Sequence, residues 1–405
     1  MKQIPGGVTA PKGFRAWGVH CGVKSKKADK KDLALILSDQ ECAAAAVYTM
    51  NRVKAAPLYV TMEHLEDGTA WGVAANSGNA NACCPMSHEN AQAMCLAAAQ
   101  ATGRAPEDFA VASTGVIGQT INITAIQAGM PALAAKLGPE GSEDAARAIM
   151  TTDTVKKELA LACSIGGRTV TLGAIAKGSG MIHPNMGTML CFVTTDCAIT
   201  REMLSEALRE VVPRTFNRVT VDGDTSTNDM CAVLANGMAG NPLIEWKDDG
   251  YTVFLKALRQ LCQELARAIA GDGEGASRLI TCAVREARSE ESAERLAKAV
   301  VGSPLVKAAM FGADANWGRV LCAMGYSKAP FRPEYVDISF SSAVGAVAVC
   351  RGGMGLDFDE EAARSILSQD EVVIDVHLHE GEHEATCWGC DLTYEYVKIN
   401  GDYRT

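Results

Sequence analysis

Apolar residues recur along the chain in patterns typical of strands and of helices. Alternating or continuous apolar runs predict strands at residues 43–49, 55–61, 71–75, 109–113, 168–176, 189–195, 217–221, 277–288, 335–340, 345–350, 372–378 and 392–399. Helical spacing or alanine-rich composition predicts helices at residues 89–102, 123–137, 145–150, 203–211, 254–270 and 290–301. Strands and helices mix without strict alternation, which favours an α+β fold of layered sheets covered by helices over a doubly wound sheet.

The glycine-rich segment at residues 176–190 reads AKGSGMIHPNMGTML and runs directly into the predicted strand at 189–195. Gly187 leaves its peptide bond unhindered, so the Thr188 hydroxyl can attack the Gly187 carbonyl, and the resulting ester can hydrolyse. Thr188 would then begin a new chain, with a free amine able to deprotonate its own hydroxyl for acyl transfer. A strand-initiating threonine with a solvated hydroxyl is the alternative, but Lys177 and the glycines favour the nucleophile.

Three polar turns could accompany such a nucleophile. At 113–118, the Gly115 N–H beside the Thr114 hydroxyl can hold a developing oxyanion, although a plain tight turn has the same sequence. Glu274, flanked by glycines, can meet a substrate ammonium or can simply mark the end of a helix. The run at 222–229 resembles a calcium loop but lacks the late bidentate glutamate, which favours a hydrogen-bonded turn near the site.

Histidines and cysteines gather near the carboxyl end, at His377, His379, His383, Cys387 and Cys390. His377 and His379 share a strand face, but no second pair of ligands has the spacing expected for zinc. Ordinary strand residues are therefore the favoured interpretation. A zinc-stabilised, non-enzymatic binding module stays open as an alternative function.

Composition narrows the class of protein. The chain has 405 residues, of which 48% are hydrophobic and 21% charged, enough for two or three domain-sized units with a sizeable core. The net charge of −10 without a basic stripe argues against nucleic acid as a partner. The amino terminus has no signal-peptide pattern, and apolar runs such as 343–350 are too short to span a bilayer, so a soluble, cytoplasmic protein is expected. Most of the 15 cysteines lie among alanines and leucines, which predicts structural thiols.

Together, several segments resemble the ornithine acetyltransferase family of arginine biosynthesis, also called glutamate N-acetyltransferases. The resemblance covers nearly the whole chain and is carried by residues 9–14, 76–82, 113–115, 177–190, 219–229, 312–319 and 396–405. It implies a layered α/β/β/α fold with chemistry similar to that of N-terminal-nucleophile hydrolases. It also implies self-cleavage into an α chain, residues 1–187, and a β chain, residues 188–405.

The resemblance implies a role for each matching residue. Thr188 would be the nucleophile, and Thr114 with Gly115 would form the oxyanion hole. The substrate site would be lined by Thr152, Lys177, Thr188, Glu274, Asn400 and Thr405. Thr151 and Thr154 flank Thr152 and compete with it for this assignment.

The implied reaction is a ping-pong transfer of the acetyl group of N2-acetyl-L-ornithine to L-glutamate. No cofactor or metal is expected, and acetyl-CoA stays open as a further acyl donor. By analogy, α and β chains would pair into a heterotetramer of two α and two β chains. An aminopeptidase or amidase, in which the same nucleophile passes the acyl group to water, is the alternative enzyme.

Overall fold

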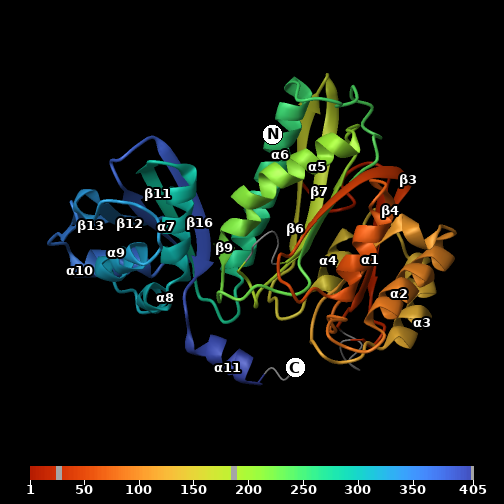
Figure 1. The fold of residues 1–405 in the computed structure, drawn as a ribbon, viewed down its shortest axis with the longest axis horizontal. Coiled ribbons are helices and arrows are strands. Elements are labelled where there is room, and N and C mark those ends of the chain that lie inside the picture. Colours follow the sequence, from red (N-terminus) through yellow and green to blue (C-terminus); the bar gives the residue numbers. More distant parts are fainter. Residues whose placement is uncertain (24–29, 184–188, 403–405) are drawn as a thin grey trace.

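The computed structural model describes residues 1–23, 30–183 and 189–402, which form two mixed sheets and the helices around them (Figure 1). Within these residues, the larger sheet has nine strands in the order β1-β6-β7-β8-β10-β3-β4-β5, with β2 paired to β3. Its strands are β1 Lys2–Ile4, β2 Phe14–Val19, β3 Leu33–Tyr48, β4 Thr69–Asn76, β5 Phe109–Ser113, β6 Lys157–Ile165, β7 Arg168–Lys177, β8 Leu190–Thr195 and β10 Met230–Ala235.

The smaller sheet, on the left of Figure 1, has seven strands among the described residues, in the order β14-β13-β12-β15-β11-β16-β9. These are β9 Val219–Thr220, β11 Leu279–Ala287, β12 Asp337–Ser342, β13 Gly345–Arg351, β14 Met354–Gly355, β15 Glu371–His377 and β16 His383–Cys390. Parallel pairs such as β11 with β15 occur beside antiparallel ones such as β11 with β16. The predicted α+β class, with mixed sheets covered by helices, is confirmed.

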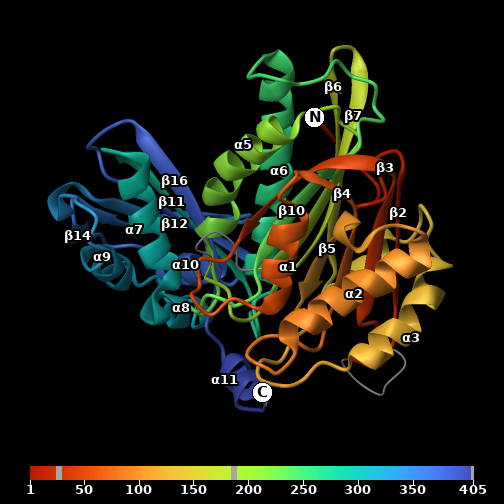
Figure 2. The same cartoon turned by 45° about the vertical axis from the view of Figure 1, so that its right-hand side comes forward.

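Helices cover both sheets and connect them. They are α1 Ala56–His64, α2 Ser87–Thr102, α3 Ile123–Ala134, α4 Ser142–Ile149, α5 Arg201–Val211, α6 Asp249–Gly271, α7 Glu290–Gly302, α8 Pro304–Phe311, α9 Trp317–Gly325, α10 Glu360–Leu367 and α11 Tyr394–Asp402. Figures 1 and 2 agree that α5 and α6 lie between the two sheets. Helix α11 contacts the end of α8, where the rings of Tyr394 and Phe311 meet edge to face at 5.6 Å. None of the helices in the described part of the chain is long and apolar enough to cross a membrane.

Helix α6 joins the two sheets because its apolar stripe is buried on both sides. Leu258, Leu261 and Leu265, three or four positions apart, are almost completely buried in a core that also contains Leu172 of β7 and Trp388 of β16. The Asp248 side chain accepts a hydrogen bond from the Tyr251 N–H at 2.7 Å and caps the helix. The end of α6 therefore delivers the following loop to the junction between the sheets.

Two predicted strands are helices instead. Residues 55–61 begin α1, where Pro57 occupies the first turn and its fixed φ favours a helix start. The Thr61 hydroxyl donates to the Val111 carbonyl at 2.7 Å, which docks α1 onto β5. Residues 392–399 enter α11, because the Thr393 hydroxyl accepts the Glu395 N–H at 3.2 Å in the manner of a helix cap.

The cysteine prediction is confirmed in most cases. All 15 cysteines lie in the described residues, and all are free thiols. Cys42, Cys95 and Cys262 are buried as predicted, whereas Cys322 is exposed on α9.

We predict that Leu261→Ala lowers the free energy of unfolding by roughly 2–5 kcal/mol, because it opens a cavity where α6 packs between the sheets. Urea denaturation followed by circular dichroism measures the change. Gln260→Ala, at an exposed position of the same helix, is the matched control and should change it by less than about 0.5 kcal/mol. Equal effects of the two substitutions would contradict the packing described for α6.

Candidate active site

Two of the predicted site residues meet although they lie at the ends of strands that are not adjacent in the larger sheet, β7 and β5. Lys177 ends β7 and is buried, and its Nζ donates to the Thr114 Oγ1 at 3.3 Å, just beyond β5. Burial lowers the pKa of the Lys177 ammonium, while Asp153, Asp229 and Glu274 oppose that shift. The structure therefore places a cation directly on the hydroxyl predicted to bind an oxyanion.

Gly115 adopts a backbone conformation that no other residue fits. Its φ is +133°, and a Cβ there would lie 2.3 Å from the Gly78 carbonyl carbon and 2.5 Å from the Asn79 nitrogen. The neighbouring N–H of Thr114 donates to the Asn76 carbonyl at 3.0 Å. Within the described residues, the Gly115 N–H has no acceptor, as an oxyanion-hole donor requires.

A buried ion triad ties two distant segments together beside Lys177. The Lys157 Nζ lies 2.7 Å from the Asp153 Oδ1 and 2.6 Å from the Asp272 Oδ2, and the lysine side chain is only 1% exposed. Burial alone would raise the pKa of Asp153, but Lys177 and Lys157 outweigh it and hold that pKa below its ordinary value. No motif in the sequence predicts this triad, because Asp272 is more than 100 residues from the other two members.

The triad also fixes the backbone on either side of the site. The Asp153 Oδ1 accepts the Gly178 N–H at 2.8 Å, immediately after Lys177. The Ser179 hydroxyl donates to the Asp272 carbonyl at 2.7 Å. The glycine-rich loop that follows β7 is thereby held against the loop that follows α6.

Glu274 lies at the point where these two loops meet. Its N–H donates to the Ser179 carbonyl at 3.0 Å, and its carboxylate packs on Gly180, where a Cβ would lie 2.3 Å from the carboxyl carbon. The Asn400 Nδ2 of α11 donates to the Glu274 Oε2 at 2.8 Å. Glu274 and Asn400, predicted from segments 126 residues apart, are thus direct neighbours.

The run at 222–229 is a hydrogen-bonded turn against the glycine-rich loop. Asp222 accepts the N–H groups of Met181 at 2.7 Å and Ile182 at 2.9 Å, and the Thr225 hydroxyl donates to the His183 carbonyl at 2.7 Å. Burial lowers the pKa of His183 to about 4, so its imidazole is neutral at pH 7. The turn therefore fixes the chain up to the last described residue before the segment 184–188.

A small cavity opens at this point. It is lined by Thr114, Lys177, Gly180, Met181, Ile182, Met189, Leu190, Ser226, Asn228 and Asp229. The Asn228 Nδ2 donates to the carbonyls of Ala80 at 2.6 Å and Ser113 at 2.8 Å, which positions the turn that carries Thr114. Lys177, Thr114 and the first residues of β8 thus surround one space.

Asp229 is a site residue that the sequence analysis did not single out. It is almost completely buried, and burial raises its pKa well above the ordinary value, although Lys177 lowers it. Its Oδ2 has no hydrogen-bond partner among the described residues. Its place at the end of a polar run just before β10 was the only available signal.

The structure says less about the positions and contacts of the remaining predicted site residues. Gly187, Thr188 and Thr405 lie outside the described residues. Thr152 is half-buried beside Asp153, and its role stays a prediction. Of its two rivals, Thr154 donates its N–H and hydroxyl to Asp272, so its side chain belongs to the ion triad.

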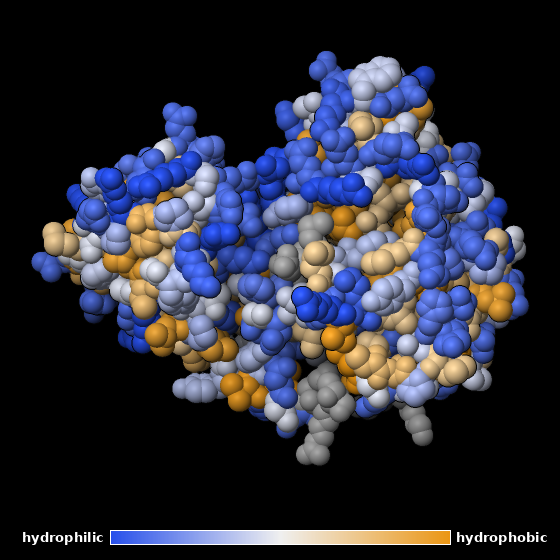
Figure 3. Space-filling model, in the orientation of Figure 1, coloured by the Kyte–Doolittle hydropathy of each residue, from blue (hydrophilic) through white to orange (hydrophobic). Residues whose placement is uncertain are grey.

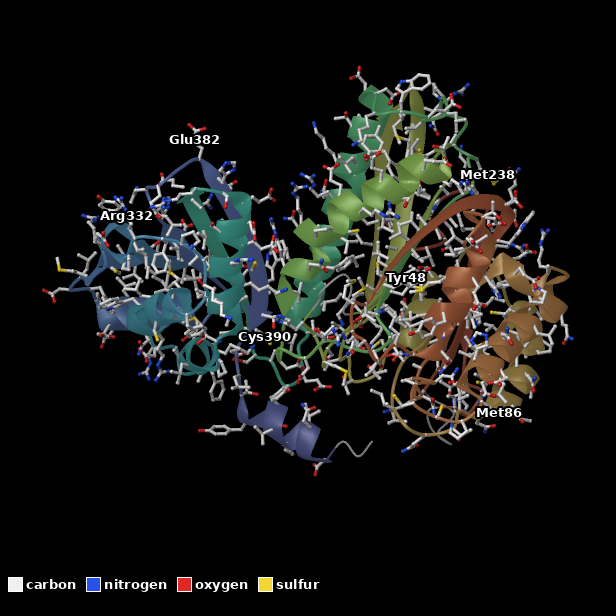
Figure 4. The ribbon with its side chains drawn as sticks, viewed as in Figure 1. Tyr48, Met86, Met238, Arg332, Glu382 and Cys390 are labelled. Atoms are coloured by element: carbon white, nitrogen blue, oxygen red, sulfur yellow. The ribbon has the colours of Figure 1, made fainter. Side chains whose placement is uncertain are left out.

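The histidine and cysteine cluster is spread over separate environments. Cys387 and Cys390 are buried, and Cys390, at the end of β16 (Figure 4), accepts a contact from the Lys307 Nζ at 3.5 Å. His377 and His379 instead share Glu286, at 3.5 and 2.8 Å, and His379 also lies 3.0 Å from Asp337. In the described part of the chain, no group of three or more side chains could hold a metal ion.

Comparison with known proteins tests the predicted family. The family model that matches residues 15–405 is that of the ArgJ family. The arginine biosynthesis bifunctional protein ArgJ of Symbiobacterium thermophilum is 55% identical over all of both chains. ArgJ 1 of Clostridium acetobutylicum is 49% identical over 97% of this chain and 96% of its own.

A solved structure gives a shorter match. The crystal structure of arginine biosynthesis bifunctional protein ArgJ from Bacillus halodurans is 46% identical with a TM-score of 0.50, over 52% of this chain and 98% of that chain. The family model and the full-length relatives confirm the predicted family, and the chain therefore belongs to the ArgJ family of arginine-biosynthesis enzymes.

Proposed function

We propose that this protein moves the acetyl group of N2-acetyl-L-ornithine to L-glutamate through an ester on Thr188. The observation that carries the proposal is that Lys177 and Thr114 line one cavity together with Met189, and that Glu274 packs on Gly180 of the glycine-rich loop. Thr188 directly precedes Met189 in the sequence. The names of the relatives, arginine biosynthesis bifunctional proteins, support the same reaction.

We also propose that the chain is cut between Gly187 and Thr188, which gives an α chain of residues 1–187 and a β chain of residues 188–405. The chain is anchored on both sides of this bond, by Asp222 and Thr225 before it and by the Met189 carbonyl, which accepts the Met230 N–H at 2.9 Å, after it. The solved Bacillus halodurans chain matches 52% of this chain over nearly all of its own length. A separate chain of about half length is what such a cut would produce.

In the proposed mechanism, the free amine of Thr188 takes the proton of its own hydroxyl as the Oγ attacks the acetyl carbon. The oxyanion then accepts from the Gly115 N–H and from the Thr114 hydroxyl. Because the Lys177 Nζ donates to the Thr114 oxygen, the hydroxyl proton is left to point at the oxyanion. The carbon–nitrogen bond breaks, the departing ornithine amine takes the proton, and the amine of glutamate attacks the ester in the second half-reaction.

The charges of the site suit an amino-acid substrate. Lys177 supplies a buried cation for an α-carboxylate, and Glu274 supplies a buried anion for the side-chain ammonium of ornithine. Thr152, Asn400 and Thr405 complete the proposed lining of the site. Acetyl-CoA, as a second donor, would form the same Thr188 ester, and the word bifunctional in the relatives' names supports that second activity. We expect two α and two β chains to assemble.

We predict that Thr188→Ala yields one uncut polypeptide and no acetyl transfer, because both steps use the same hydroxyl. A denaturing gel and an assay of ornithine release measure the two outcomes. Thr188→Ser, which keeps a hydroxyl, is the matched control and should retain cleavage. Two fragments from Thr188→Ala would refute the assignment. Ornithine release by the unmodified protein should also require glutamate; release that is independent of glutamate would establish the hydrolase alternative.

Gly115→Ala should lower kcat by about 100-fold or more, because the Cβ collides with the Gly78 backbone and displaces an oxyanion donor. Gly118→Ala is a matched control, since Gly118 also has a positive φ, +79°, but a Cβ there meets no atom within 4 Å. Steady-state kinetics on both variants separates loss of the donor from ordinary backbone strain. Equal kcat values for the two variants would contradict the assigned oxyanion hole.

A further inference from the structure

A broad groove on the larger sheet shares no lining residue with the cavity at the proposed active site. It has a volume of about 870 Å³ and runs between α1 and α5 over the last residues of β3. Its apolar side is formed by Ala46 and Tyr48 of β3, Met62 of α1 and Met203 of α5, all of them partly exposed. Figure 3 shows apolar side chains gathered between α1 and α5, and Figure 4 labels Tyr48 there.

The other wall of the groove carries an ordered pattern of charge. Glu202, Ser205, Glu206 and Arg209 of α5 all line the groove, and their spacing of three and four residues places them in one stripe along the helix. Arg201 and Glu210 flank the stripe at its two ends. A partly apolar surface rimmed by such a stripe is typical of a protein interface.

The stripe is complementary to itself. When two copies of α5 meet antiparallel about a two-fold axis between Ser205 and Glu206, Glu202 faces Arg209 of the partner subunit. The same operation places Arg201 opposite Glu210 of the partner subunit and Ser205 opposite Glu206 of the partner subunit. Every opposed pair is then either an opposite-charge pair or a serine–carboxylate pair, and each occurs twice, as an isologous interface requires.

The stripe is only partly paired within its own chain. Among the described residues, Arg209 has no ion-pair partner, whereas Glu206 pairs with Lys247 at 2.5 Å and Glu210 pairs with Arg259 at 3.1 Å. Arg201 and Glu202 pair with each other at 2.7 Å, but their side chains are 52% and 62% exposed, so exchanging that partner costs little.

We propose that the groove between α1 and α5 is the surface through which two copies of this protein associate, with their α5 helices antiparallel across a two-fold axis. The occupant of the groove is the α5 helix of the second copy, which covers the apolar residues of β3 and α1. This groove would be the contact surface between the two αβ units that are expected to assemble. It does not depend on acetyl transfer, because the groove shares no residue with the site.

Charge reversal tests the proposed register directly. Arg209→Glu alone, or Glu202→Arg alone, sets like charges opposite each other at two places in the dimer. Each should raise the dimer dissociation constant by roughly tenfold or more. Mixing the two variants should restore dimers, because both charge pairs between the unlike copies are again attractive. Analytical ultracentrifugation of the purified, full-length protein distinguishes 42.7 kDa units from pairs of them.

Arg295→Glu is the matched control, because Arg295 is exposed on α7 and pairs with Glu291 of its own helix at 2.9 Å. It should leave the dissociation constant unchanged. The proposal is overturned by an unmodified protein that stays as single 42.7 kDa units, by single reversals that leave the dimer intact, or by a mixture that does not reassemble. Ornithine release measured on the same samples reports separately on the proposed acetyl transfer.

Discussion

The site depends on one buried lysine that holds two aspartates from different parts of the chain. Lys157 opens β6, whereas Asp272 follows α6 and Asp153 precedes β6. Placing three charges out of water costs several kcal/mol per ion, and the cost is offset only while all the partners keep their geometry. The triad therefore joins the larger sheet to the loop that leads into the smaller one. It also contacts the residue next to Lys177, because the Gly178 N–H donates to the Asp153 carboxylate.

The surroundings of the Lys177 ammonium follow from this arrangement. Lys177 is surrounded by the carboxyl groups of Asp153, Asp229 and Glu274, and in a buried setting their interactions with its ammonium are stronger than they would be in water. Asp153 is already paired with Lys157, which leaves the Lys177 ammonium to hold the Thr114 oxygen and to face the cavity. The loops remain in place because Gly178 and Ser179 donate to members of the same triad. The proposed chemistry and the packing of the two sheets thus share one set of contacts.

Local signals in the sequence predicted a large part of this site. Gly115 was singled out from a polar turn and Lys177 from the glycine-rich segment, and the structure places these two segments in contact through Lys177 and Thr114. The triad could not be predicted, because Asp272 and Lys157 are 115 residues apart and a single sequence does not show which distant charges meet. Two strand predictions failed for a local reason: alternating apolar residues are also compatible with a short helix when Pro57 or Thr393 starts it.

Hydrogen–deuterium exchange of the Lys157→Met variant measures whether the ion triad anchors both loops. Amides at 178–182 and at 272–276 should gain exchange together, because both loops lose the same anchor, while those of α9 keep their protection. Lys156→Met is the matched control, since its side chain is 30% exposed and its partners are Glu143 and Glu158. Unchanged exchange in both loops, or a gain in only one of them, would show that the triad does not hold the two loops together.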